Sequence, residues 1–141
     1  MPDSRKRLAD GAFLLALMLY ILYGTTQVPP HVDEYMQVAM ARDYFILRDQ
    51  GSAALAFTPP LEVDTLQYLR LLNGTLQKNL IGVLLAASGR TADTLPNIYA
   101  WAMPLEWNIA AGNVADTESL HLARWTSAVL TALAVVPIFM L

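Results

Sequence analysis

The chain has 141 residues, of which 55% are hydrophobic and only 15% are charged. Its mean hydropathy is +0.39, and a typical globular domain carries about 25% charged residues, so this composition favours a membrane protein. The net charge of −3 argues against nucleic acid as a partner, and the lack of cysteine excludes disulfides, thiol catalysis and thiolate metal sites.

A polar start with a basic cluster at residues 5–7 precedes an uninterrupted apolar run at residues 12–23. With its flanks, the segment 11–28 reaches the ~20 residues that a helix needs to cross a bilayer. A cleaved signal peptide has a similar pattern, but no small-x-small cleavage site follows, so the sequence favours an uncleaved signal anchor. The positive-inside rule then predicts that residues 1–10 are cytoplasmic and that the chain after the anchor is periplasmic or extracellular.

An acidic pair follows this anchor. Pro29 and Pro30 cannot continue a helix and predict an extended exit. Asp33 is then a good N-cap, and Glu34 suits the positive end of a helix dipole. Apolar residues recur behind the pair at helical spacing, which predicts a helix over 34–48 with one face on the membrane surface or against the membrane helices.

A second helical pattern covers residues 66–88, where leucines recur in register. Asn73-Gly74 interrupts this pattern, so we expect a helix break or two consecutive helices. The apolar segment 80–87 is too short to span a bilayer and fits a buried or interfacial helix. Gly89 is its expected C-terminal stop.

Residues 90–121 are irregular and contain Trp101 and Trp107. Amphipathic aromatic rings favour the headgroup layer, so this segment is expected either to lie on the membrane or to bury both tryptophans as ordinary core residues. The core interpretation is preferred. A role in sugar stacking is the weakest of the three interpretations.

Residues 122–141 form the second predicted transmembrane helix, and no charge follows Arg124 at its outer end. The run stops without polar flanks, so we expect the sequence to be the start of a longer protein. The predicted fold class is an all-α membrane protein. Two transmembrane helices are joined by a long external loop, residues 29–121, that contains amphipathic or interfacial helices.

Three local patterns follow one another along the chain: DEYMQVAMARDY from Asp33, KNLIGVLLAASG from Lys78, and ARWTSAVLTALAVVPIFML up to Leu141. In this order they resemble the N-terminal region of the GT-C membrane glycosyltransferases, of the protein O-mannosyltransferase and aminoarabinose-transferase type. The resemblance covers nearly all of the chain but only a small part of such an enzyme. The sequence departs from the family at residues 73–76, where His-Pro-Pro-Leu is usual, and in the segment 90–121, which has no counterpart.

The resemblance implies transfer of a sugar from a polyprenyl-phosphate donor to an acceptor outside the cytoplasmic membrane, typically a bacterial inner membrane. It implies that Asp33 is the catalytic base or a metal ligand, with Glu34 orienting or supporting it. Such transfer needs a base for the acceptor's proton and a cation or metal for the leaving phosphate. Arg42, Lys78 and Arg124 are the candidate lipid or phosphate contacts, although lone cations on surface helices are usually solvated.

Two alternatives stay open. An Asp-Glu pair at a helix start is also what capping and the helix dipole select, without any catalytic role.

The second alternative concerns the whole chain. Two spans are too few to enclose a polyprenyl-phosphate site, so this short chain is not expected to be active alone. It is alternatively a non-catalytic accessory or structural subunit of a larger membrane complex, for example a respiratory or photosynthetic one. Its expected partners are membrane lipid, the lipid-linked sugar or other membrane subunits. No cofactor is expected in this chain, and a divalent metal would belong to the full enzyme.

Overall fold

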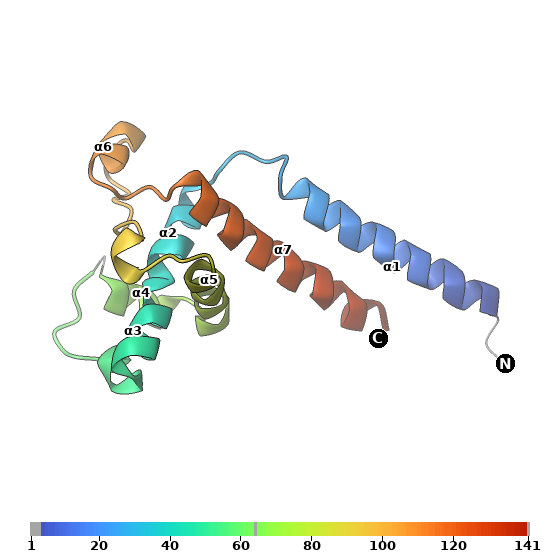
Figure 1. The fold of residues 1–141 in the computed structure, drawn as a ribbon, viewed down its shortest axis with the longest axis horizontal. Helices are drawn as coiled ribbons and strands as arrows, with labels where there is room; N and C mark the ends of the chain where they lie inside the picture. The colour runs from blue at the N-terminus through green and yellow to red at the C-terminus, as the bar shows by residue number, and fades with distance from the viewer. Residues whose placement is uncertain (1–3, 64, 141) are drawn as a thin grey trace. The chain divides into compact units, whose positions relative to one another are not determined.

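The computed structural model describes residues 4–63 and 65–140, with side chains from Lys6 onward. Parts of the predicted N terminus and of the predicted last helix lie outside the described residues: residues 1–3, the side chain of Arg5, and Leu141. The described part is all-α and contains no strand, which confirms the all-α part of the predicted class (Figure 1). Its helices are α1 (Ser4–Gly24), α2 (Val32–Met40), α3 (Arg42–Gln50), η1 (Ser52–Leu55), α4 (Leu66–Leu72), α5 (Thr75–Ala87), η2 (Ala92–Thr94), α6 (Leu105–Ala110) and α7 (Thr117–Met140).

The chain divides into two compact units. The first unit combines residues 1–29 with residues 124–141, and the second unit comprises residues 30–123. The first unit therefore holds α1 and most of α7, whereas the second unit holds the segments predicted to be external.

Two helices are long and apolar enough to cross a membrane, Lys6–Gly24 and Thr117–Met140. In the first unit, the rings of Phe13 in α1 and Phe139 in α7 lie 6.0 Å apart between centroids. Arg124 donates a hydrogen bond from Nη1 to the carbonyl oxygen of Val28 at 3.0 Å. The two segments at the ends of the chain are thus joined by an apolar ring contact and by a polar contact.

The helix predicted to begin at residue 122 begins earlier, at Thr117. The carboxylate of Asp116 accepts hydrogen bonds from the backbone N–H of Ser119 at 3.0 Å and from its hydroxyl at 2.7 Å. A side chain that satisfies an N–H of the first turn in this way favours a helix start at that place. Arg124 consequently lies inside α7 rather than at its head.

The single helix predicted over 34–48 is two helices, α2 and α3, that meet at Ala41. The Ala41 N–H donates to the carbonyls of both Gln37 and Val38, and the Tyr44 N–H donates to Ala41 at 3.0 Å. The hydrogen bonding therefore tightens from the i−4 to the i−3 pattern at this residue, which separates the two helices.

The second unit has two clusters of buried apolar residues that share α2. The larger cluster joins α2 and α3 to α5, to the segments before and after α6 and to the first turns of α7: Val38, Ala41, Phe45, Ile81, Leu85, Leu95, Ala115 and Ala123. The smaller cluster consists of Met36, Met40, Leu69 and Tyr99. α2 thus buries one side against α5 and another against α4.

The break predicted at Asn73-Gly74 is confirmed, because α4 ends at Leu72 and α5 begins at Thr75. The predicted stop at Gly89 is also confirmed. Gly89 has a φ of 85°, its N–H donates to Ala86, and the next N–H, of Arg90, donates to Leu85. This pair of bonds satisfies the last carbonyls of α5, and glycine adopts the required left-handed conformation without strain.

Gly82 lets α3 and α5 approach closely. A Cβ atom at this position would lie 2.3 Å from Cβ of Tyr44 and 3.0 Å from the carbonyl oxygen of Ala41. The obstructing atoms are the Ala41 carbonyl oxygen and the Tyr44 Cβ, and neither can move without moving the helix backbone.

The substitution Gly82→Ala is predicted to destabilise the second unit by about 1–3 kcal/mol, the usual cost of overpacking. This loss outweighs the gain of roughly 1 kcal/mol that alanine brings to a helix interior. Urea unfolding in mild detergent, followed by circular dichroism, measures the change. Gly11→Ala in α1 is the matched control, because a Cβ there meets nothing within 4 Å. Equal or higher stability of Gly82→Ala would contradict the predicted close approach.

Candidate functional site

Asp33 lies in the first turn of α2 with an exposed side chain. The N-cap of this helix is His31, whose Nδ1 accepts a hydrogen bond from the Asp33 N–H at 3.3 Å. The prediction that Asp33 itself caps the helix is therefore wrong, because the imidazole already satisfies that backbone donor. The Asp33 side chain is 66% exposed, and its Oδ2 lies 3.3 Å from the same imidazole nitrogen.

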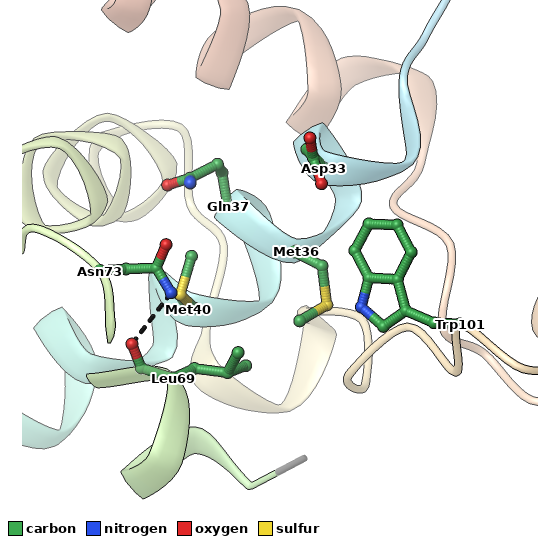
Figure 2. Close-up of a pocket in the computed structure, with 7 residues that line it drawn as sticks. All are labelled: Asp33, Met36, Gln37, Met40, Leu69, Asn73 and Trp101. Carbon is green, nitrogen blue, oxygen red and sulfur yellow. Dashed lines mark hydrogen bonds between the residues drawn. The ribbon is translucent and has the colours of Figure 1, made fainter. Parts of the chain in front are cut away.

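The Asp33 carboxylate borders a pocket of about 300 Å³ in the second unit. Seven residues line it: Asp33, Met36, Gln37, Met40, Leu69, Asn73 and Trp101. The four residues from α2 converge on the pocket because their spacing of three and four places them on one helix face. Figure 2 shows Asp33 beside Met36 and Trp101 at one end, and Asn73 beside Met40 and Leu69 at the other.

Trp101 is held in this place by a row of aromatic rings. The ring of Tyr35 on α2 stacks against Tyr99, with centroids 6.0 Å apart, and Tyr99 meets Trp101 edge-on at 5.7 Å. The Tyr99 N–H also donates to the sulfur of Met36 at 3.2 Å. The indole is 54% exposed, so the interpretation of Trp101 as a core residue is wrong.

Asn108 fixes the loop that carries Trp101. Its Oδ1 accepts from the Ala100 N–H at 2.8 Å, and its Nδ2 donates to the carbonyls of Ala100, Met103 and Pro104. This fully buried amide thus ties the loop to α6. Trp107 on α6 is 44% exposed and is likewise not a core residue.

Two other predicted site residues lie near the start of the second unit but away from the pocket. Glu34 is half-buried next to Asp33 and is not among the described residues that line the pocket. Arg42 donates from Nη2 to the carbonyl oxygens of Leu95 at 3.0 Å and Pro96 at 3.3 Å. Its guanidinium therefore links α3 to the segment after η2.

Lys78 is 1% exposed and forms an ion pair with Asp43, which is equally inaccessible. Its Nζ lies 2.8 Å from Oδ2 of Asp43, and Arg70 approaches the same carboxylate with two nitrogens, at 2.9 and 2.7 Å. Arg70 also donates to the carbonyl of Leu55 at 3.3 Å. We call Asp43, Arg70 and Lys78 the buried ionic triad. In this arrangement Lys78 is enclosed, so its predicted contact with lipid or phosphate has no support from its position.

The triad lowers the pKa of Asp43. Burial alone would raise that pKa, but the hydrogen bonds from Arg70 and Lys78 and their two positive charges outweigh it and hold the pKa below its usual range. Asp116 behaves similarly. Burial opposes its ionisation, while the hydrogen bonds from Ser119 and the charge of Arg90 lower its pKa. Asp43 is thus a buried carboxylate that joins three helices through two charged partners.

Arg124 belongs to the first unit, where its guanidinium binds the carbonyl of Val28. Its contact with headgroups or phosphate stays a prediction. A metal at Asp33 would also need further ligands, because the described residues contain no group of three histidine or acidic side chains that fits a metal ion. Asp33 as a metal ligand, and the divalent metal implied for the full enzyme, therefore stay predictions.

The sequence pointed to Asp33 but not to its neighbours in the pocket. Gln37 could have been found, because it follows Asp33 by one helical turn. Asn73 and Trp101 come from distant segments, so no local pattern links them to Asp33.

Comparison with known proteins gave no match, either among family models, among curated proteins or among solved structures.

The substitution Asp43→Asn is predicted to lower the free energy of unfolding by about 3–5 kcal/mol, because it leaves buried positive charge without its partner. Urea unfolding near neutral pH measures the loss. Asp49→Asn, an exposed aspartate on the same helix, is the control, and we expect it to change stability by less than about 0.5 kcal/mol. A loss for Asp43→Asn as small as that of the control would show that the triad is dispensable.

Protonation of Asp43 is also predicted to destabilise the folded protein at acid pH. Because its folded pKa is lowered, its contribution is fully present above the unfolded pKa of about 3.9 and is lost as the pH falls through the folded pKa. The free energy of unfolding should therefore decrease from about pH 5 downward. The decrease should be smaller in Asp43→Asn, with a remainder from Asp116. An unchanged pH profile in this variant would contradict the assignment.

Proposed function

We propose that this chain is the N-terminal part of a membrane glycosyltransferase of the GT-C type, which transfers a sugar from a polyprenyl-phosphate donor to an acceptor outside the cytoplasmic membrane. One observation supports it above the others. Asp33, on the helix that follows the first apolar helix, has an exposed carboxylate and lines a pocket.

The topology of the proposal follows from the charges. Basic residues 5–7 lie in the first turns of α1, ahead of its apolar run, so the N terminus lies in the cytoplasm when α1 and α7 span the membrane. The second unit then lies outside, where a lipid-borne donor presents its sugar. Asp33 follows the end of α1 at Gly24 by nine residues, and the proposal puts it on the outer side with the rest of the second unit.

The proposed reaction uses Asp33 as the base. The acceptor hydroxyl oxygen attacks the anomeric carbon, and its proton passes to the Asp33 carboxylate. The bond between the anomeric carbon and the phosphate oxygen breaks, and polyprenyl phosphate leaves with the electron pair. Capping does not compete with this role, because His31 is the N-cap of α2 and leaves the Asp33 carboxylate accessible.

The leaving phosphate needs positive charge, and two of the expected cations are already used inside the protein. Lys78 pairs with Asp43, and Arg42 binds two backbone carbonyls. Arg124 is 8% exposed and binds the carbonyl of Val28, so the proposal assigns phosphate stabilisation to none of these three residues and leaves it to other groups of the full enzyme. Glu34 has a supporting role beside Asp33.

The substitution Asp33→Asn, made in the protein as its gene encodes it, is predicted to reduce sugar transfer by about 10²-fold or more, the usual contribution of a general base. Transfer from polyprenyl-phosphate sugar in native membranes is the measurement. The variant should fold normally, because the side chain is largely exposed.

Asp49→Asn is the matched control, since Asp49 is an exposed aspartate of the same unit and lies away from the pocket. Normal transfer by Asp33→Asn would refute the catalytic role of Asp33.

Purification of the native protein with its partners is a second test. A 15.5-kDa chain in stoichiometric complex with larger membrane subunits, without transfer activity, would instead favour the accessory-subunit alternative.

A further inference from the structure

We propose that the pocket beside Asp33 binds the acceptor of the transfer, and that this acceptor is an uncharged, hydroxyl-rich ring such as a pyranose. The inference rests on the proposed function, because it states which of the two substrates the pocket receives. It also makes a binding claim that can be tested without any transfer.

The charge of the pocket excludes the phosphate end of the donor. Asp33 is the only charged residue among the described residues that line it. An anionic ligand would therefore meet a carboxylate of the same sign with no cation to compensate. The arginines and the lysine of the second unit do not help, since each binds a group of the protein itself: Arg42, Arg48, Arg70, Lys78 and Arg90.

The lining combines a flat apolar surface with hydrogen-bonding groups around it. Trp101 presents a half-exposed indole, and Met36 lies next to it (Figure 2). A pyranose has one apolar face of C–H groups, and such a face packs well on an aromatic ring. Its hydroxyls point outward from the ring edge, where polar side chains can bind them.

Three polar side chains supply these groups. Asp33 offers carboxylate oxygens, and Gln37 offers an amide with donor and acceptor atoms. Asn73 donates from Nδ2 to the carbonyl of Leu69 at 3.0 Å, which fixes its amide and leaves Oδ1 as an acceptor. Hydroxyl groups both donate and accept, so they match this mixed set, whereas an aliphatic ligand would leave the polar groups unpaired.

The site is also preorganised. The row of rings from Tyr35 through Tyr99 holds Trp101, and the buried amide of Asn108 fixes its loop. A fixed aromatic surface loses little conformational entropy on binding, so it contributes more of its contact energy to affinity. One proton-accepting carboxylate at the edge of a sugar platform is the arrangement that an acceptor hydroxyl requires.

Ligand-observed NMR on the purified protein in detergent tests the inference with two probes that share one ring, methyl α-glucopyranoside and glucose 6-phosphate. We expect the neutral probe to bind and the phosphate to bind at least about tenfold more weakly. Trp101→Ala should weaken binding of the neutral probe by about tenfold or more, and Trp101→Phe should retain most of it. Trp107→Ala is the control, because Trp107 is an exposed tryptophan that does not line the pocket.

Absence of binding by the neutral probe, equal or tighter binding of glucose 6-phosphate, or equal affinities of Trp101→Ala and Trp107→Ala would each overturn the inference. Two separate readouts distinguish the inference from the proposed function, because binding of methyl α-glucopyranoside to Trp101→Ala reports on the pocket and transfer by Asp33→Asn reports on the base. Retained transfer in Asp33→Asn, with binding lost in Trp101→Ala, would refute the base but leave the sugar pocket. The opposite pair of results would refute the pocket alone.

Discussion

The second unit depends on the carboxylate of Asp43. It is the point at which α3, α4 and α5 are joined by charge, because Arg70 comes from α4 and Lys78 from α5. Removing two cations and an anion from water is costly, and the cost is offset only while all three remain together. A different packing of these helices that separated the three would leave a charge buried alone.

The triad also supports the pocket. Arg70 directly follows Leu69, and Asn73 is the C-cap of the same short helix, so the ion pair that holds Arg70 also holds two lining residues. On the opposite side, Gly82 lets α5 press against α3. The face of α2 that carries Asp33 is thus flanked by elements whose positions are set by buried charge and close backbone contact rather than by the exposed site residues.

This separation between support and site explains why the charged residues have such different environments. Asp33 is exposed and lies beside the imidazole of His31, whereas Asp43 is enclosed by the cations Arg70 and Lys78. A sequence motif rich in charges, DEYMQVAMARDY, therefore contains one candidate reactive carboxylate and one structural carboxylate within a few turns. Their roles follow from the helix face on which each lies, because α2 turns its first residues outward and α3 buries Asp43 against α4 and α5.

The sequence alone determined the helical class, the two long apolar segments, the break at Asn73-Gly74 and the stop at Gly89. These features depend on local physics: apolar length, helical periodicity and the conformational freedom of glycine. The tertiary structure alone decided the partner of Lys78, the exposure of Trp101 and the pocket that joins Trp101 and Asn73 to Asp33. Those outcomes depend on contacts between residues tens of positions apart, and no local pattern encodes them. Even the choice of His31 over Asp33 as N-cap was decided by the folded geometry, since both residues can accept the same kind of hydrogen bond.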